Sequence, residues 1–314
     1  MNNKIKNLVI SVGGNALSND PKKDAVLLEP IAKIIVNNVK NGINVLLTTG
    51  NGPQSGELFD IINDANKTNS KHLLMKLDEA NAMSQGYIGF HVMKAIYNEL
   101  LANNLENKYS INCLETLTIV DENDVAWTQP TKPIGAFFKT IDEAKQQYPN
   151  DKIIEDAGRG YRKVVSSPKP IGFVGIEGIK KVLNSGCITI TSIGGGIPCI
   201  IKNNKIISME GIIDKDYSTA LLANLICADL LLIVTAVDGV YIDYNTKNEK
   251  KIDKISTIEL EKLISEYDFG KGSMEPKLKA AINFVNKTDN IAIITNINDV
   301  EDAIKFKKGT IIIK

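Results

Sequence analysis

Residues 194–216 join a run of three glycines to the triplet Asp214, Lys215 and Asp216. A loop without Cβ atoms lets main-chain N–H groups close on an anion, and a lysine beside it adds a full positive charge. Lys215 also opens a predicted helix, where the helix dipole disfavours a cation by roughly 0.3–1 kcal/mol. The two flanking aspartates alone could offset this cost, but the same three side chains also suit a site that binds phosphate.

Glycines follow predicted strands at three places in the sequence. The three stretches are VISVGGNAL (residues 9–17), LLTTGNGPQSGEL (46–58) and TSIGGGIP (191–198). Because ligands of open parallel sheets bind beyond the carboxyl ends of the strands, we expect the three loops to converge on one edge. Neither a P-loop nor a G-x-G-x-x-G fingerprint is present in the setting it requires, so the sequence predicts phosphate binding by another scheme.

A second lysine, Lys277, opens the helical pattern SMEPKLKAAINFV, with Glu275 as its acidic neighbour. Glu275 could balance the charge of Lys277 locally, as the aspartates could for Lys215. Phosphoryl transfer, however, depends almost wholly on positioning and on neutralising charge, so lysines and backbone amides are sufficient for it. We therefore predict that Lys215 and Lys277 face a polyphosphate, with a carboxylate holding them in position.

Short apolar runs rich in β-branched residues alternate with helical patterns along the chain. Because the runs are apolar on both faces, they indicate strands inside a parallel sheet. The repeated alternation predicts an α/β fold, a three-layer αβα sandwich with a mainly parallel central sheet. The predicted strands are Asn7–Val12, Ile43–Thr48, Cys187–Ile193, Asp229–Val237, Ile291–Thr295 and Thr310–Ile313.

The stretch 121–167 departs from this alternation. It is polar, carries prolines, and holds Trp127 and the segment TQPTKPIG without a clear long helix. Loops of this length without structure are uncommon unless they are functional. We interpret 121–167 as a protruding subdomain inserted into a single domain that spans 1–314.

Composition narrows the class of protein. Lysine plus arginine equals aspartate plus glutamate, at 37 each, which argues against a general nucleic-acid binder. The four cysteines lie far apart and indicate neither a zinc site nor a redox pair, and scattered thiols suit a reducing cytosol. No stretch approaches the ~20 apolar residues of a membrane span. We therefore expect a cytoplasmic protein that binds neither nucleic acid nor a membrane.

At these glycine and lysine stretches the sequence resembles the carbamate kinases, a branch of the amino acid kinase superfamily. The matching stretches run from end to end: VGGNAL, GNGPQSG, AMSQGYIGF, QPTKPIG, YRKVVSSPKP, GGGIP, GIIDKD, ADLLLIVTAVDGVY, GSMEPK and GTIIIK. The resemblance implies reversible phosphoryl transfer between ATP and carbamate, with ADP and carbamoyl phosphate giving ATP in arginine breakdown. It also implies Mg²⁺ bound with ATP or ADP, and a homodimer.

The resemblance also implies roles for particular residues. Lys215 and Lys277 would stabilise the equatorial oxygens of the transferred group, Asp216 would orient them, and Lys132 would reach over the substrate from the insert, which becomes a lid. The substrate-binding residues would be Gly13, Gly14, Asn15, Gly50, Asn51 and Gly52. The nucleotide would contact Asp214, Ala236, Val237, Tyr241 and Met274. No residue is implied as a direct metal ligand.

Four residues differ from the pattern usual in this family: Thr49, Ser166, Ile193 and Glu275 stand where histidine, proline, glycine and glycine are common. We expect Glu275 to point away from the transferred phosphoryl group and to complement the helix dipole. Two alternatives remain: a relative that forms another acyl phosphate or phosphorylates a nucleotide, and a non-catalytic nucleotide-binding protein on the same scaffold. Lys132 in TKPIG weakens the first alternative. Retention of all three lysines argues against the second.

Overall fold

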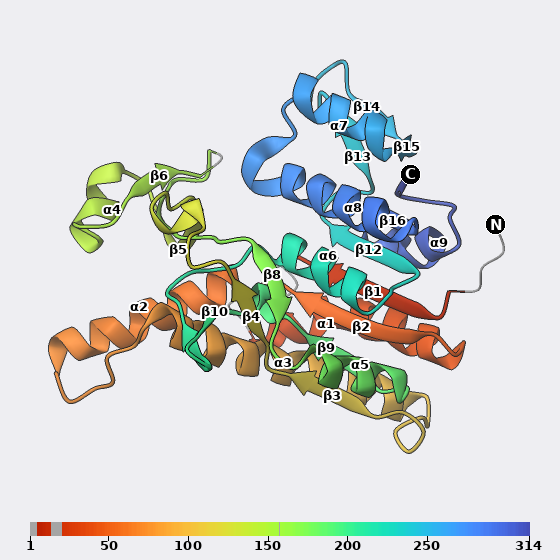
Figure 1. The fold of residues 1–314 in the computed structure, drawn as a ribbon, viewed down its shortest axis with the longest axis horizontal. Helices are drawn as coiled ribbons and strands as arrows, with labels where there is room; N and C mark the ends of the chain where they lie inside the picture. Colours follow the sequence, from red (N-terminus) through yellow and green to blue (C-terminus); the bar gives the residue numbers. More distant parts are fainter. Residues whose placement is uncertain (1–4, 14–20, 157) are drawn as a thin grey trace.

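The structure, a computed structural model, describes residues 5–13, 21–156 and 158–314. At its centre lies an eight-stranded sheet in which neighbouring strands are parallel except at the β16–β17 pair (Figure 1). In sheet order the strands are β15 (Lys254–Ser256), β17 (Thr310–Ile313), β16 (Ile291–Asn296), β12 (Leu230–Thr235), β1 (Asn7–Val12), β2 (Asn44–Thr49), β9 (Ile188–Thr191) and β3 (Ile111–Leu114). The prediction of a mainly parallel central sheet is confirmed.

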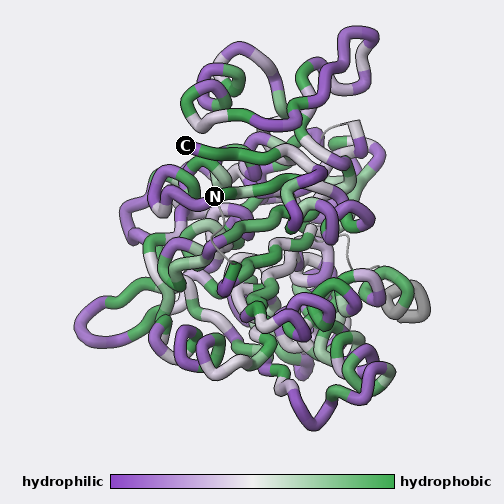
Figure 2. The backbone as a smooth tube through the Cα atoms, turned by 90° about the vertical axis from the view of Figure 1, so that its right-hand side faces the viewer, coloured by the Kyte–Doolittle hydropathy of each residue, from purple (hydrophilic) through white to green (hydrophobic). Residues whose placement is uncertain are grey.

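Helices cover both faces of this sheet and complete the three layers. One face carries α1 (Pro21–Lys40), α3 (Leu77–Ala102) and α9 (Val300–Ile304), and the other carries α5 (Ile176–Asn184), α6 (Lys215–Leu225), α7 (Thr257–Glu266) and α8 (Glu275–Thr288). Successive strand residues point to opposite faces, so Ile10 lies in the first core and Val9 in the second. Figure 2 shows the hydrophobic segments gathered toward the interior and hydrophilic segments in the outer loops. No helix within the described residues has the length and apolar character needed to cross a bilayer.

The strands inside the central sheet were predicted from the sequence, whereas the two strands at its edges were not. All six predicted strands are present: β1 and β17 have the predicted ends, and the ends of the other four are shifted by at most two residues. The predicted strand Cys187–Ile193 ends early, at Thr191, because Ile193 begins a 3₁₀ turn. The edge strands β3 and β15 were not predicted, since β15 has three residues and every residue of β3 is only half-buried, which leaves little apolar signal.

Residues 121–167 form a small three-stranded sheet with one short helix, outside the central sheet (Figure 1). The strands, in order, are β5 (Lys132–Phe138), β7 (Tyr161–Val165) and β6 (Ile153–Glu155), and the helix is α4 (Ile141–Gln147). Directly before and after this insert, β4 (Leu117–Val120) and β8 (Pro170–Phe173) pair antiparallel, so both ends of the insert leave from one place. The insert also packs closely on α2 (Gly52–Thr68), where an added Cβ on Gly56 would lie 2.4 Å from the Gly135 amide nitrogen.

Candidate active site

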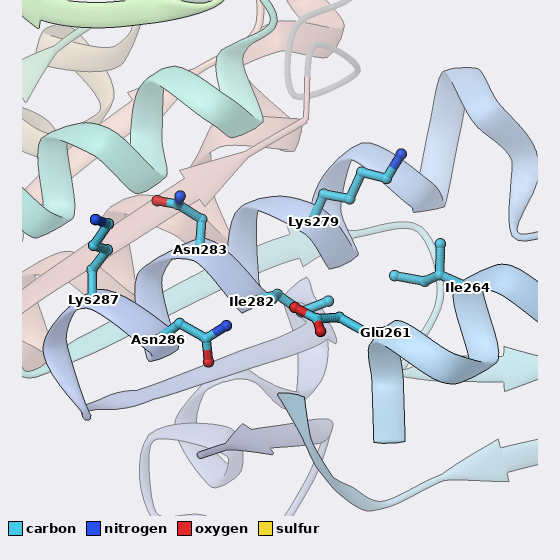
Figure 3. Close-up of a pocket in the computed structure, with 7 residues that line it drawn as sticks. All are labelled: Glu261, Ile264, Lys279, Ile282, Asn283, Asn286 and Lys287. Atoms are coloured by element: carbon cyan, nitrogen blue, oxygen red, sulfur yellow. The ribbon is translucent and has the colours of Figure 1, made fainter. Parts of the chain in front are cut away.

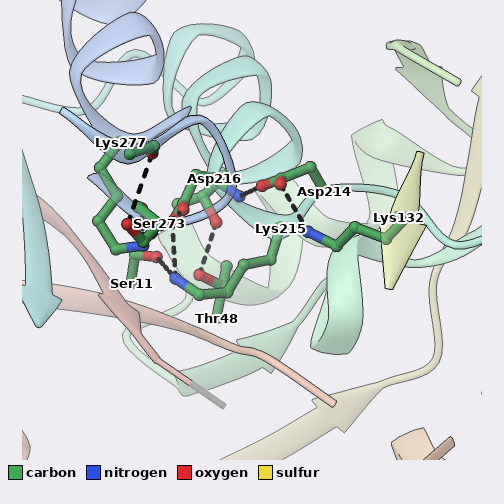
Figure 4. Close-up of polar contacts among 10 residues, drawn as sticks. Ser11, Thr48, Lys132, Asp214, Lys215, Asp216, Ser273 and Lys277 are labelled. Atoms are coloured by element: carbon green, nitrogen blue, oxygen red, sulfur yellow. Dashed lines mark hydrogen bonds and ion pairs between the residues drawn. The ribbon is translucent and has the colours of Figure 1, made fainter. Parts of the chain in front are cut away.

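Two lysines share one buried aspartate near the carboxyl end of β1 (Figure 4). Lys215 Nζ donates to Asp216 Oδ1 at 2.7 Å, and Lys277 Nζ donates to Asp216 Oδ2 at 3.1 Å. Lys215 also donates to Ser11 Oγ at 2.7 Å, and Lys277 donates to the Ser273 carbonyl at 2.9 Å. The side chains of both lysines and of Asp216 are at most 15% exposed. The structure therefore brings two predicted lysines and one predicted carboxylate into a single cluster.

The lysines converge because two neighbouring helices begin here. α6 begins at Lys215, and the Asp214 side chain caps it by accepting from the Asp216 amide at 2.9 Å. α8 packs along α6 and begins at Glu275, after a π turn at Gly270–Met274. Lys277 thus lies in the first turn of α8. Single π turns beside α-helices are rare and frequently occur at functional sites.

Burial and charge act against one another in this cluster. Burial lowers the pKa of Lys215 below its usual value; the charge of Asp216 counteracts this effect, and the nearby charge of Lys277 adds to it. Burial disfavours the Asp216 carboxylate, but the charges of Lys215 and Lys277 outweigh burial and lower its pKa to about 2. Asp216 therefore stays ionised at neutral pH and holds together two cations that would otherwise repel each other. Such a cluster can neutralise a phosphoryl group bound beside it.

The insert contributes the third predicted lysine from a different direction. Lys132, the first residue of β5, donates from Nζ to Asp214 Oδ2 at 2.6 Å. Since Asp214 immediately precedes Lys215, all three lysines lie within one connected network of aspartates (Figure 4).

The first two glycine loops lie next to each other. The Gly50 amide donates to the Val12 carbonyl at 3.1 Å, which links the chain after β1 to the chain after β2. Chain neighbours aside, a Cβ added to Gly13 would come no closer than 4.0 Å to a described atom, and one added to Gly52 would meet none within 4 Å. Packing against the described part of the chain therefore does not require either glycine, as expected where a ligand approaches the backbone. The predicted residues Gly14 and Asn15 lie outside the described residues.

The third glycine loop packs tightly against other parts of the protein. All three glycines at 194–196 have positive φ and are buried. A Cβ on Gly194 would lie 2.0 Å from the Asn51 side chain, and one on Gly196 would lie 2.1 Å from Thr118 Oγ1. The space beside these glycines is thus filled by protein. This loop packs against the side chain of the predicted substrate residue Asn51.

Several polar residues that support the site were not found from the sequence. Asn51 Nδ2 donates to Ser84 Oγ at 2.8 Å and to Asn81 in the same helix, α3. Thr49 Oγ1 and both polar atoms of the Gln54 side chain are buried and have no hydrogen-bond partner among the described residues. The signal that could have found such residues is a polar side chain within an apolar run, as Ser11 in NLVISV.

The residues expected to contact the nucleotide lie after β12 and before α8. Ala236 is exposed and Val237 is half-buried, directly after β12. Tyr241, in β13 (Val240–Ile242), donates from its hydroxyl to Asp238 Oδ1 at 2.5 Å. Met274 ends the π turn and packs against the core. The fifth expected residue, Asp214, has both carboxylate oxygens engaged within the protein.

A separate groove of about 660 Å³ lies between α7 and α8 and is lined by none of the predicted site residues (Figure 3). Charged and polar side chains of both helices line it, among them Glu261, Lys279 and Lys287.

Lys279 forms an ion pair with Glu275, the first residue of α8. Glu275 therefore pairs with Lys279, whereas Lys277 forms its ion pair with Asp216.

Known proteins match the sequence and the fold over nearly the whole chain. The amino acid kinase family matches residues 6–296. A carbamate kinase-like protein of Mycoplasma pneumoniae is 42% identical over 311 residues, covering 99% of this chain and 100% of its own. The carbamate kinase of Latilactobacillus sakei is 41% identical over 315 residues, covering 98% and 99% of the two chains. The structure of the Giardia lamblia carbamate kinase bound to AMP-PNP superposes with a TM-score of 0.87 at 38% identity and covers 98% of both chains.

The chain therefore belongs to the amino acid kinase family and, within it, to the carbamate kinases.

Proposed function

We propose that the chain transfers a phosphoryl group reversibly between ATP and carbamate, and that it works mainly toward ATP, from ADP and carbamoyl phosphate. The observation that carries the proposal is the Lys215 and Lys277 pair on Asp216, in a chain of the carbamate kinase family. Carbamate is unstable and carbamoyl phosphate is a good phosphoryl donor, which favours the direction of ATP formation.

The reaction needs charge to be neutralised at one phosphorus atom. An oxygen of the ADP β-phosphate attacks the phosphorus of carbamoyl phosphate, a new P–O bond forms, and the bond to the carbamoyl oxygen breaks to release carbamate. No proton has to move to a protein side chain. Lys215 and Lys277 would neutralise the equatorial oxygens as charge builds on them, while Asp216 keeps the two ammonium groups in fixed positions.

The loops at residues 13–15 and 50–52 would hold carbamate and the transferred group through their backbone amides. The absence of any close contact from the described residues to a Cβ placed on Gly13 or Gly52 supports this role. Further support comes from the buried polar atoms of Thr49 and Gln54, which have no partner within 5–13, 21–156 and 158–314 and lie at the end of β2 and in the first turn of α2. Because buried polar groups nearly always have partners in folded proteins, a small polar ligand or water is expected beside them.

The nucleotide would bind along Ala236, Val237, Tyr241 and Met274, next to the first turn of α8. The Giardia lamblia relative in this family binds AMP-PNP, an ATP analogue. We place the reaction in the cytoplasm. All four cysteines are free, as is usual in a reducing compartment.

Mg²⁺ would enter with the nucleotide. Among the described residues no group of three His, Cys, Asp or Glu side chains could hold a metal ion. The site carboxylates, Asp214 and Asp216, are each paired with lysine. These residues do not fit a metal held by the protein, so we expect phosphates and waters to supply the Mg²⁺ ligands.

The insert at 121–167 would act as a lid that places Lys132 over the substrate. Its sheet is separate from the central sheet, and both of its ends leave from the β4–β8 pair, which suits movement about that pair. Closure of such a lid excludes water and completes the set of cations around the phosphoryl group.

We also propose a homodimer formed through one face of α3. Met83, Phe90, Tyr97 and Leu101 lie along this face and are 46% to 59% exposed. Next to α3, the hairpin of β10 (Ile197–Lys202) and β11 (Lys205–Ser208) exposes further isoleucines, at 201, 206 and 207. A twofold axis through this face would bury both apolar surfaces against a second copy. Light scattering should give the mass of two chains, and Phe90→Lys should shift it toward one.

The substrate assignment is tested by measuring ATP formed from ADP and Mg²⁺ with different acyl phosphates. We expect carbamoyl phosphate to react faster than acetyl phosphate, aspartyl phosphate or N-acetylglutamyl phosphate. Faster turnover of another acyl phosphate would overturn the choice of carbamate while retaining phosphoryl transfer. No turnover with any of them would favour a non-catalytic nucleotide-binding protein.

A further inference from the structure

Asp214 connects the insert to the catalytic helix through its two carboxylate oxygens (Figure 4). Oδ1 accepts from the Asp216 amide at 2.9 Å and so caps α6. Oδ2 accepts from Lys132 Nζ at 2.6 Å. The cap fixes Asp214 relative to Lys215, the next residue. The same carboxylate therefore fixes Lys132 relative to the other two lysines.

The insert meets the chain that leads into Asp214 at further points. The Ile212 amide donates to the Ser166 carbonyl at 2.9 Å. Trp127 lies against Gly211, where an added Cβ would be 3.1 Å from the indole ring. Asp214 is thus the last residue of a segment that the insert contacts and the capping residue directly before the helix that begins with Lys215. A change in the position of the insert would therefore directly alter the contacts of Asp214.

The Lys132 and Asp214 side chains are 30% and 15% exposed, so water screens their pairing less than it would a surface ion pair. A lysine side chain held in one place has already lost its rotamer freedom before the substrate arrives, which reduces the cost of binding. The cap and the ion pair can be separated experimentally, because serine and asparagine also cap helices but carry no negative charge.

We propose that Asp214 is a positioning residue for Lys132: it holds the lysine of the insert at the phosphoryl site before substrate binds. Carbamoyl phosphate then meets three ordered cations instead of two. This role differs from the nucleotide contact that family resemblance implies for Asp214. It rests on the proposed function, because the phosphoryl group is the ligand that Lys132 meets.

The test compares Lys132→Ala, Asp214→Ser and the double variant with the unaltered protein. Each single change should raise KM for carbamoyl phosphate about tenfold, with a smaller change in kcat. The double variant should differ from either single variant by no more than about twofold, because both changes remove the same interaction. KM for ADP should stay nearly constant throughout.

Two further variants separate positioning from structure. Asp214→Asn keeps a capping oxygen and should behave like Asp214→Ser, with nearly unchanged thermal stability. Asp142→Asn removes an exposed carboxylate of the insert and should leave KM unaltered. Effects that multiply in the double variant, or Asp214 variants that raise KM for ADP instead, would overturn the proposal.

A second readout does not depend on turnover. Trp127 is the only tryptophan of the chain and lies beside Gly211, so its fluorescence reports the contact between the insert and this segment. Acrylamide should quench it more strongly in ligand-free Lys132→Ala and Asp214→Ser, by similar factors, and not in Asp142→Asn. Unchanged quenching in both single variants would refute the role of the pair. This quenching pattern in a protein without carbamate kinase activity would instead refute the proposed function and leave the contact standing.

Discussion

The three lysines of the site are held in two different ways. Lys215 and Lys277 come from the sandwich itself, lie at helix starts, and share Asp216 in a buried cluster. Lys132 comes from a peripheral sheet, is twice as exposed as Lys277, at 30% against 15%, and has its own aspartate, Asp214. The first arrangement is part of the fold, whereas the second joins two parts of the chain that are 82 residues apart.

This difference predicts that the two regions have different roles in the reaction. A buried pair of cations on one carboxylate cannot relax away from a developing charge, so it suits the stabilisation of a transition state. A lysine on an insert contributes only when the insert is in place, so it suits binding and closure. Changes to the two regions should therefore separate into effects on kcat and effects on KM.

The largest effect after Lys215 itself is expected at Lys277. Lys277→Ala should lower kcat by ~10²–10³, because a charge placed where the transition state needs it is commonly worth about 2.7–4 kcal/mol. Steady-state kinetics of ATP formation measure this loss. Lys279→Ala, two residues further along α8 and outside the cluster, is the matched control and should keep nearly full activity. Equal losses in both variants would show that the effect comes from the helix and not from the site.

A smaller effect, and of another kind, is expected at Lys132. Lys132→Ala should act mainly through KM for carbamoyl phosphate, about tenfold, because binding and commitment of the substrate depend on the insert. Lys139→Ala, an exposed lysine of the same insert, provides the control. A loss confined to kcat, as large as that of Lys277→Ala, would show that the two regions do not differ in their roles.

The burial of Lys215 and Lys277 should also affect how the activity depends on pH. Since burial lowers the pKa of Lys215 in the free protein, its ammonium should be lost at a lower pH than that of an exposed lysine, so kcat/KM should fall as pH rises through that pKa. Asp216, with a pKa of about 2, stays ionised and adds no acid limb near neutrality. Because the charge of Lys277 helps to lower the pKa of Lys215, the residual activity of Lys277→Ala should decline at higher pH. A profile that is flat up to 10.5, the ordinary lysine value, would contradict this account.

The smallest effect is expected at Glu275. It lies in the first turn of α8, where a carboxylate complements the helix dipole, and it pairs with Lys279. Glu275→Gly should change kcat/KM for ADP by less than about tenfold and lower the melting temperature slightly, because the dipole contribution is roughly 0.3–1 kcal/mol. A gain of about a hundredfold or more would show that Glu275 opposes the phosphates.

The buried cluster of Lys215, Lys277 and Asp216 was predictable from the sequence, because its residues lie in short sequence motifs. Lys215 and Lys277 each stand at the start of a strong helical pattern, and parallel strands bring such helix starts to one edge of the sheet. The capping residue Asp214 and the shared residue Asp216 are sequence neighbours of Lys215, so the triplet itself carried the information.

The contacts between distant segments were not predictable from the sequence. Nothing near Gly194 in the chain shows that Asn51 fills the space beside it. Nothing near Lys132 shows that Asp214 receives it. The edge strand β15 and the insert strand β6 have three residues each, and their pairing depends on tertiary contacts that sequence periodicity does not show.

The central claim is that Lys215 carries the charge that the transition state requires. Its most direct test is kcat for ATP formation by Lys215→Ala at saturating ADP and carbamoyl phosphate, in a protein shown to be folded by its melting curve. The account predicts a fall of about 10²–10³. A kcat equal to that of the unaltered protein would show that Asp214, Lys215 and Asp216 serve only the fold.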